Sequence, residues 1–589
     1  MVVARPICLG ETDEGAELYV SAKERATHMQ VMGSIGKGKT TFLERLIRQD
    51  IANGHGVCVI DPHGQLYENL VAWCAQFGFE NRRKIHLIDP SAPDWRVGFN
   101  PLLVHSDDLT EILDRVDIVL DAFSQAWGGE DLDRLPLYQR MCGALLYAIA
   151  AKRLTLVEAV QALPASRQSY REYLGSNLPD DVFSGVWEEI MGFSRREVSE
   201  RFQSAFNRIE QFIKRPFLRE MLGQQASIDF QRCMDEGDIV LVNLQPLSRI
   251  QGRLLGKLLI NSMFTAALRR EADRSRPFYL FIDECHRFLG ADIEAILIET
   301  RKFGLHMTLA HQNLQQLESA GEEIYHAVLT QAQIKVVFGI GYRDAMITAD
   351  ALMADEYDLD EPKKSLAKPF TVGFKRVLHH HRSRTESHGG GDSMVHTELE
   401  GETETAGQGE SAATATRQLL DDWGGEIETR VTPTTQTAGQ TQTSGLAKST
   451  QNATAFGSTS SWSSGTSEGA SEALEPIIEW LQTAMYSLEE QRHRKAVTMM
   501  RQPVGHAIVK IVDSRTQRVT TYEPRPIPAR SERIAAFKER VLARSIYAVP
   551  RDLIERELRD RSENLKIRVI EHKTLLPAQV KEIKDDDWG

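Results

Sequence analysis

Short apolar runs alternate with segments of helical periodicity in two regions of the chain. The runs lie at 29–32, 56–61 and 85–89, and again at 238–244, 277–283, 305–310 and 334–340. Between them, apolar residues recur every three or four positions, as in the segment after residue 39, with Phe42, Leu43, Leu46, Ile47 and Ile51. Strands that alternate with helices predict an α/β fold with a mostly parallel sheet.

The pattern changes between about 105 and 230, where strand-like runs are missing. Two amphipathic helices are predicted there by apolar residues at helical spacing, Leu137, Met141, Leu145, Leu146 and Ile149 in one and Val198, Phe202, Phe206, Ile209 and Ile213 in the other. We therefore expect an all-α insertion domain inside the α/β core. Arginines and glutamates interleave from 195 to 220, which favours a solvated charged face over a nucleic-acid contact.

A low-complexity segment follows the second group of core strands. Residues 379–470 begin with His379, His380 and His381 and continue in sequence rich in Ser, Thr, Gln and Gly. Such sequence buries too little apolar surface to offset its ordering entropy, so we expect it to be disordered. A metal site on the histidine run is the less favoured interpretation, because Cys and acidic partners at ligand spacing are missing.

Apolar periodicity returns after residue 470. It predicts a helix from 474 to about 491 and a hairpin made of 505–512 and 518–522, which would return to the core. The last 60 residues are charged and helical in pattern and end in Asp585-Asp-Asp-Trp-Gly589. The predicted division is therefore an N-terminal core segment, an insertion domain, a second core segment, a disordered linker, a returning helix and hairpin, and a helical tail, at 1–104, 105–230, 231–378, 379–470, 471–528 and 529–589.

Composition narrows the class of protein. The chain has 589 residues, 41% hydrophobic and 26% charged, so we expect about three folded units. Its net charge of −13 weakens a DNA-coating role but leaves room for basic loops inside a pore. Six scattered cysteines without a CxxC pair indicate reduced thiols, and neither a disulfide framework nor a zinc site is expected. No apolar run approaches the roughly 18 residues of a membrane span. We expect a cytoplasmic protein without membrane insertion.

A phosphate-binding loop lies at the end of the first predicted strand. Gly33, Gly38, Lys39 and Thr40 fill the pattern G-x-x-x-x-G-K-[ST], with a strand before it and a helix after it. Lys39 is expected to reach the β- and γ-phosphates, and Thr40 to ligate Mg²⁺. The predicted ATP-binding residues are Gly33, Ser34, Gly36, Lys37, Gly38, Lys39, Thr40 and Thr41.

Polar residues end several of the predicted strands. Asp283 and Glu284 follow an apolar strand, where two adjacent carboxylates are costly unless a cation lies nearby. Asp283 is expected to hold Mg²⁺ and Glu284 to polarise the attacking water. Gln312 is placed to sense the γ-phosphate at the tip of another strand. Asp61 is predicted either to face the nucleotide or to form a turn, and for Asp89 the turn is favoured.

Taken together, these motifs resemble the HerA/FtsK superfamily of ring-forming ATPases with a RecA-like core, and within it the VirD4/TraD/TraG-type coupling proteins of conjugation. The motifs are the phosphate loop, Asp61-Pro-His-Gly64, Asp89-Pro-Ser91, Phe99-Asn-Pro-Leu102, Ile282-Asp-Glu284, Arg301-Lys-Phe-Gly304 and His311-Gln-Asn313. The resemblance implies a hexamer in which Arg301 is an arginine finger, although Arg301 also suits a helix C-terminus. Membrane-anchored members begin with two transmembrane helices, which this sequence does not show.

The expected function is movement of DNA through a central pore, driven by hydrolysis of ATP with Mg²⁺, in conjugative transfer or type IV secretion. The resemblance implies a relaxase or a secretion-channel protein as partner, with recruitment to the inner face of the membrane by that partner. Two alternatives stay open. One is a VirB4-like ATPase that acts on protein, and the other is a nucleotide-dependent regulatory switch.

Overall fold

The computed structural model describes residues 5–583 apart from 128–135, 163, 165, 273, 291–292, 359–366, 389–402, 406–417, 421–425, 429–442, 447–461, 483–484, 513, 526 and 528–529. The chain divides into two compact units, residues 1–356 with 492–589 and residues 357–491. Among the helices described, none combines the length and the apolar character needed to cross a bilayer.

An eleven-stranded sheet forms the centre of the first unit, in the order β2-β1-β18-β17-β10-β3-β9-β8-β4-β7-β5. Seven neighbouring strands are parallel: β10 (Ile334–Val337), β3 (Met29–Met32), β9 (Leu305–His311), β8 (Phe278–Ile282), β4 (Gly56–Asp61), β7 (Ile239–Asn243) and β5 (Ile85–Ile88). The α/β class and the mostly parallel sheet are thus confirmed.

Four antiparallel strands extend the sheet beyond β10. They are β17 (His506–Ile511), β18 (Gln517–Thr520), β1 (Ile7–Thr12) and β2 (Glu17–Val20). The predicted hairpin near 505–522 is β17 and β18, and it attaches the C-terminal region of the chain directly to the strand beside the phosphate loop.

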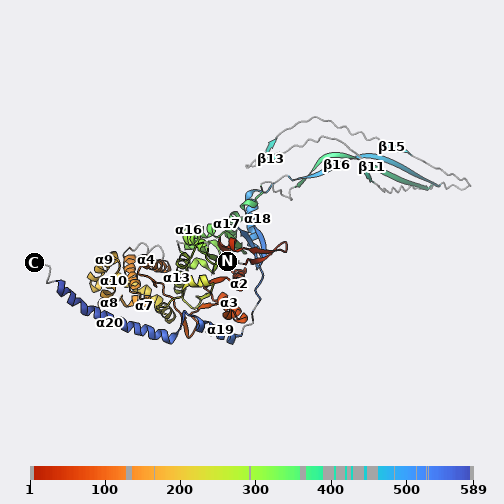
Figure 1. The fold of residues 1–589 in the computed structure, drawn as a ribbon. Coiled ribbons are helices and arrows are strands. Elements are labelled where there is room, and N and C mark those ends of the chain that lie inside the picture. The colour runs from red at the N-terminus through yellow and green to blue at the C-terminus, as the bar shows by residue number, and fades with distance from the viewer. Residues whose placement is uncertain are drawn as a thin grey trace. The chain divides into compact units, whose positions relative to one another are not determined.

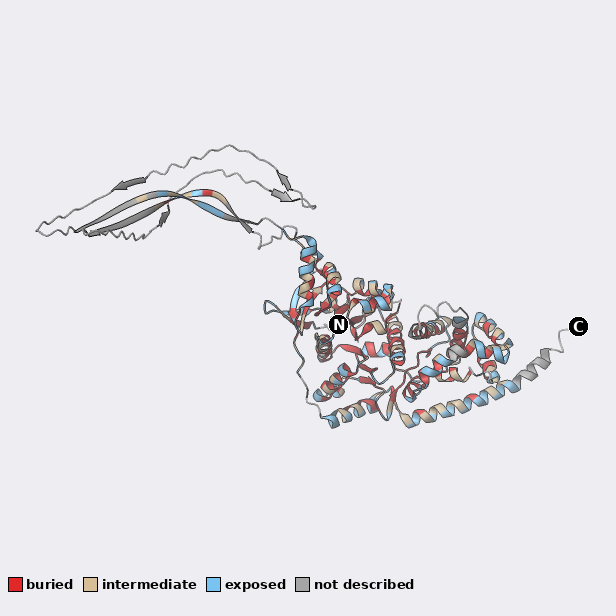
Figure 2. Ribbon diagram, turned by 180° about the vertical axis from the view of Figure 1, so that it is seen from behind, coloured by how far each residue is buried: buried red, intermediate tan, exposed pale blue. Residues whose placement is uncertain are grey.

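Helices cover the sheet, and the central strands are buried on both faces (Figure 2). This explains why those strands are continuous apolar runs without alternation. The helical elements of this core are α1 (Ala22–Arg25), α2 (Lys39–Ala52), α3 (Gln65–Phe77), η1 (Phe79–Asn81), α13 (Arg249–Leu268), η2 (Cys285–Arg287), α14 (Ile293–Thr300), η3 (Arg301–Phe303), α15 (Leu314–Ala320), α16 (Glu322–Gln331), α17 (Tyr342–Met353), η4 (Ala354–Glu356) and α18 (Leu488–Met500).

A helical region follows β6 (Trp95–Val97), and its described residues contain no strand before β7. Its helices are α4 (Leu109–Trp127), α6 (Pro136–Ala151), α7 (Leu156–Ala162), α8 (Gln168–Gly175), α9 (Asp181–Gly192), α10 (Arg195–Ile213), α11 (Pro216–Leu222) and α12 (Phe230–Glu236). Ser194 and Glu197 form a capping box at the start of α10. On this helix Arg196 pairs with Glu200 at 2.8 Å, as expected for a charged face.

The C-terminal segment runs back along the first unit. Helix α19 (Ser531–Arg544) contacts α3 and β5, and β19 (Ala548–Pro550) pairs antiparallel with β6. Helix α20 (Arg551–Ile583) then runs beside the helical region between β6 and β7 and contacts α8 and α11 (Figure 1). The segment therefore contacts both the sheet and this helical region, which belong to one compact unit.

The second unit is built on one long antiparallel pair, β11 (Ala367–His388) with β16 (Trp462–Gln482). Short strands β12 (Thr403–Thr405) and β15 (Thr443–Leu446) pair with these two, and β13 (Gln418–Leu420) pairs with β14 (Glu426–Glu428).

Two predictions are wrong in this region. The helix expected from 474 is a strand to Gln482, and α18 begins only at Leu488. Pro476 would break a helix, and in the ladder it lies opposite Phe374. The expected disorder over 379–470 is wrong at both ends, which belong to β11 and β16. These two strands pair with each other, so their backbone N–H and C=O groups are hydrogen-bonded although the sequence is of low complexity. Much of the remaining low-complexity stretch lies outside the described residues.

Candidate nucleotide-binding site

The phosphate loop joins β3 to α2 at the carboxyl edge of the parallel strands. Gly38 is the N-cap of α2 and has φ +106°, a conformation that glycine adopts without steric cost. A Cβ at Gly33 would lie 2.6 Å from Cβ of Phe338, so the close approach of the loop to the end of β10 requires glycine there. The result is a tight turn that leads into the N-terminus of a 14-residue helix, where an anion is favoured.

Lys39 is turned into the site. It is 7% exposed, and Nζ donates a 2.7 Å hydrogen bond to the carbonyl of Gly33 at the other end of the loop. Burial lowers the pKa of Lys39, while the charges of Glu284 and Asp283 act in the opposite direction. The ammonium group and the two carboxylates therefore interact across the site.

The carboxylates of Asp283 and Glu284 follow β8, which is separated from β3 by β9. Asp283 and Glu284 are 4% and 3% exposed, and the backbone N–H of Glu284 donates to Oδ1 of Asp283 at 3.0 Å. Glu284 has φ +49°, an unusual left-handed conformation for a residue with a side chain. Burial and the charges of Glu284 and Asp61 raise the pKa of Asp283 to about 6. Burial and negative neighbours therefore oppose ionisation of this carboxyl group, and a cation bound beside it would stabilise the ionised form.

Two amides hold the Glu284 carboxylate. Nε2 of Gln312 donates to Oε1 at 2.7 Å, and Nε2 of Gln316 donates to Oε2 at 3.5 Å. Gln316 also accepts a 2.8 Å hydrogen bond from the backbone N–H of Gln312, which fixes the turn after β9. Gln312 thus lies at the tip of β9 and meets Glu284, a contact that the sequence analysis did not predict.

A buried polar chain leads away from this turn through the sheet. Nζ of Lys335 on β10 donates to Oε1 of Gln30 on β3 at 2.8 Å, and Nε2 of Gln30 lies 2.8 Å from Nε2 of His311 on β9. Nδ1 of His311 lies 3.0 Å from the carbonyl of Asn313. The chain therefore connects three adjacent strands to the residues that flank Gln312.

Arg301 lies at the other edge of the sheet. It is exposed and precedes β9, in the turn where the N–H of Phe278 bonds to the carbonyl of Gly304. The five residues of β8 separate this edge from Glu284, on the order of 15 Å along the strand. The structure does not bring Arg301 to the carboxylates of its own chain.

Several other predicted residues have clear partners. The N–H of Ser34 donates to the carbonyl of Gly339 at 2.9 Å, and the ammonium group of Lys37 donates to the carbonyl of Gln502 at 3.0 Å. Asp61 accepts hydrogen bonds from the N–H groups of His63 and Tyr67, so it shapes the turn after β4. The expected turn also forms at Asp89, which accepts from Ser91.

Thr40 and Thr41 lie in the first turn of α2, half-buried, and Gly36 has φ +75° within the loop. Gln30 and Gln316 were missed by the sequence analysis, and His311 was named there only as part of a motif, without a role of its own. A signal existed for Gln30, because a polar residue stands in the otherwise apolar run Met29–Met32. Gln316 follows Gln312 by four residues, the spacing of one helical face.

Two family models match the chain. The one described as the central domain of the helicase HerA matches residues 7–262, and the one described as the DNA-binding domain of type IV secretion-system coupling proteins matches residues 185–367. No match was found among curated proteins.

Solved structures that match the chain include the bacterial conjugative coupling protein TrwBdeltaN70, with 15% identity over 90% of this chain and 92% of that chain and a TM-score of 0.45. The plasmid coupling protein TrwB in complex with ADP and Mg²⁺ has 14% identity over the same shares and a TM-score of 0.45. VirB4 of Thermoanaerobacter pseudethanolicus has 15% identity over 62% of this chain and 93% of that chain, with a TM-score of 0.40.

Proposed function

We propose that this chain is a HerA-type ATPase of the coupling-protein kind, an ATP-driven motor that moves DNA; the two family models, matched over residues 7–262 and 185–367, support this proposal. The observation that carries the proposal is the meeting of Lys39, Asp283, Glu284 and Gln312 at one edge of the sheet. These residues come from three strand ends and include a cation, two carboxylates and an amide donor.

ATP with Mg²⁺ fits this arrangement. The loop from Gly33 to Thr41 would hold the phosphates, and Thr40 with Asp283 would hold the metal ion, whose charge relieves the cost of burying Asp283. Bound Mg²⁺ supplies stabilisation of the charge that develops on the phosphates. Glu284 orients and polarises the attacking water, while the amides of Gln312 and Gln316 keep its carboxylate in place.

The position of Arg301 supports a site shared between subunits. Because it lies at the edge opposite its own Glu284, it can serve as a finger only for the nucleotide of a neighbouring copy. A closed ring, with a hexamer as the expected size, provides that contact for every subunit. An isolated chain should then hydrolyse ATP very slowly.

DNA is the proposed cargo, contacted through loops that line the pore, because the net charge of −13 disfavours a broad basic surface. The coupling-protein domain supports conjugative transfer or type IV secretion as the setting. A relaxase or a channel protein is the proposed partner, and it would recruit the chain to the inner face of the membrane.

The test is the steady-state rate of ATP hydrolysis with and without single- and double-stranded DNA, in wild type mixed with rising fractions of Arg301→Ala. We expect stimulation by DNA and a loss of activity steeper than the mutant fraction, since one defective finger disables a neighbour's site. Lys302→Ala, at the adjacent exposed position, is the matched control. Its presence should lower activity no more than in proportion to its fraction of the mixture.

Other results identify the alternatives. Stimulation by a protein substrate without any response to DNA would favour a VirB4-like ATPase. Tight ATP binding with turnover that neither DNA nor protein raises would favour a regulatory switch. Strictly linear dilution by Arg301→Ala would contradict the shared site.

A further inference from the structure

A second cluster of chemically reactive side chains lies at the amino edge of the sheet, away from the phosphate loop. Among the described residues, His86 on β5, Cys233 on α12 and Asp238 before β7 each place one donor atom within 4.8 Å of the others. Their side chains are almost fully buried, with exposures of 3%, 0% and 5%. We propose that these three residues form a site for a transition-metal ion of the Zn²⁺ type.

The local fold brings two of the donors together. Helix α12 ends at Glu236, and the left-handed backbone of its C-cap Gly237 (φ +72°) turns the chain sharply into β7. The N–H of Asp238 then donates to the carbonyl of Cys233 at 2.8 Å, which holds the thiol and the carboxylate on the same side of the turn. The third donor arrives from β5, the neighbour of β7 in the sheet. A metal ion bound to these three residues would join α12, the start of β7 and β5 at one point.

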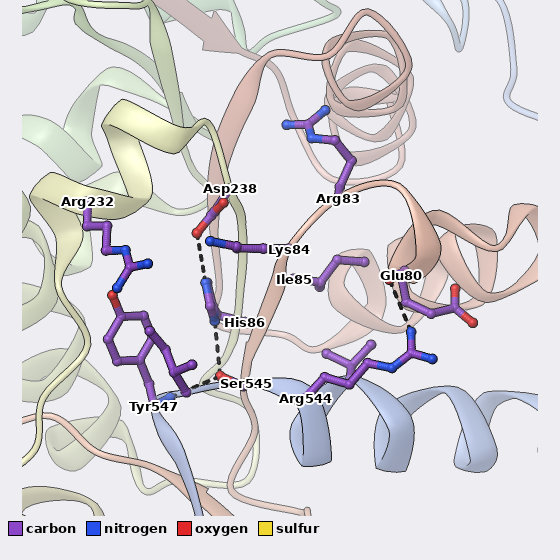
Figure 3. Close-up of a pocket in the computed structure, with 12 residues that line it drawn as sticks. Glu80, Arg83, Lys84, Ile85, His86, Arg232, Asp238, Arg544, Ser545 and Tyr547 are labelled. Carbon is purple, nitrogen blue, oxygen red and sulfur yellow. Dashed lines mark hydrogen bonds and ion pairs between the residues drawn. The ribbon is translucent and has the colours of Figure 1, made fainter.

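The imidazole is already oriented. Nε2 of His86 lies 3.0 Å from Oδ2 of Asp238, and Nδ1 lies 3.1 Å from Oγ of Ser545 at the end of α19 (Figure 3). A metal-bound histidine usually has such a partner on its second nitrogen, which sets the ring orientation. Through Ser545 the site would also tie α19 to the sheet.

An adjoining cavity of about 180 Å³ gives access and room for water as a fourth ligand. It is lined by His86, Asp238, Ser545 and Tyr547 and by four cationic side chains, Arg83, Lys84, Arg232 and Arg544. These cations have acceptors of their own: Lys84 and Arg232 bond to Glu236, Arg83 to the carbonyl of Gly237, and Arg544 to the carbonyl of Glu80. Lys84 and Arg232 thus share one carboxylate, and Arg83 and Arg544 bond to backbone carbonyls.

The donor set selects the class of ion. One sulfur, one imidazole nitrogen and one carboxylate oxygen suit Zn²⁺ and similar borderline ions, whereas Mg²⁺ and Ca²⁺ prefer oxygen ligands alone. Binding would release the Cys233 thiol proton to solvent, because the thiolate is the ligand. The site is independent of the proposed motor activity, since it shares no residue with the phosphate loop.

The test uses Co²⁺ as a spectroscopic probe on the full chain, without an affinity tag of histidines, and with His379, His380 and His381 changed to Ala to remove the histidine run. We expect one Co²⁺ per chain, a thiolate-to-cobalt absorption band in the near ultraviolet, and displacement by Zn²⁺. Cys233→Ser should abolish the band, and Ser545→Ala should weaken binding about 10- to 100-fold by releasing the imidazole.

Cys142→Ser is the matched control, because Cys142 is also a buried helical cysteine but lies on α6. It should leave the band unchanged. His86→Gln provides a second ligand variant, and far-ultraviolet circular dichroism checks that each variant folds. Absence of the band in the parent chain, or its survival in either ligand variant, would overturn the proposal.

Discussion

Gln30 and His311 meet inside the sheet, and their contact fixes the protonation of the histidine. Because Lys335 can only donate, its 2.8 Å bond makes Oε1 of Gln30 the acceptor and leaves Nε2 of Gln30 as the donor to Nε2 of His311. The remaining ring proton is on Nδ1, which donates to the carbonyl of Asn313. Burial lowers the pKa of His311 to about 3, so the ring stays neutral and the arrangement persists at physiological pH.

We predict that Gln30→Leu lowers kcat for ATP about tenfold and leaves KM nearly unchanged. The substitution removes the donor that holds His311 and so loosens the turn that aims Gln312 at Glu284, without touching the phosphate loop. Steady-state kinetics of the full chain provide the measurement.

The control for that variant is Thr300→Val, which removes another buried hydrogen bond, from Oγ1 to the carbonyl of Ile296, at the far edge of the sheet. Thr300→Val should lower the free energy of unfolding by ~1 kcal/mol, as Gln30→Leu does, but leave kcat unaltered. Equal losses of kcat in both variants would mean that Gln30 acts only through stability.

Lys39→Ala and Glu284→Gln should both stop hydrolysis but differ in binding. Loss of the Lys39 ammonium removes a direct phosphate contact, whereas Glu284→Gln removes only the group that polarises water. Equilibrium binding of labelled ATP should therefore be lost in the first variant and retained in the second. Failure of Glu284→Gln to bind ATP would contradict the role assigned to Glu284.

Asp283→Asn should stabilise the protein in the absence of Mg²⁺ and nucleotide. The pKa of Asp283 is raised from 3.8 to about 6, so the folded chain holds this proton more tightly than the unfolded chain. Ionisation between these two values costs stability, and the full cost is present above about pH 6. We expect ~1–3 kcal/mol of added stability near pH 7.5 and about half of that gain near pH 5. Urea unfolding at the two pH values checks this, and an equal gain at both would contradict it.

Glu220→Ala should loosen the C-terminal segment. The buried Glu220 carboxylate accepts hydrogen bonds from Nε of Arg96 and Nε of Arg551, both at 2.8 Å, and so joins β6 to the start of α20. Its loss leaves the buried guanidinium of Arg96 without this partner, at a cost of ~3–5 kcal/mol.

Arg551→Ala is the comparison for that prediction. The Arg551 side chain is 43% exposed, so we expect a loss of about 1 kcal/mol or less. The urea midpoint of each variant, with protease cleavage ahead of α20, reports the difference. A smaller loss for Glu220→Ala than for Arg551→Ala would refute the role of Glu220.

The sequence by itself determined which segments become the buried parallel strands. It also identified the phosphate loop and the two carboxylates of the candidate site. Continuous apolar runs predicted the buried parallel strands, because a strand covered on both faces has no polar alternation. The phosphate loop and the Asp283–Glu284 pair were recognisable because their backbone and charge requirements are local. Those requirements leave few other residue types at these positions.

The tertiary structure alone decided which strands are neighbours. Strand order places Gln30 beside His311 and Lys335, residues about 280 and 305 positions away, and local periodicity carries no record of such pairing. It likewise brought His86 to Cys233 and Asp238, and turned the segment after residue 470 into a strand by giving it a partner in β11. Pairing and packing energies act between distant segments, so they override local propensity where the two disagree.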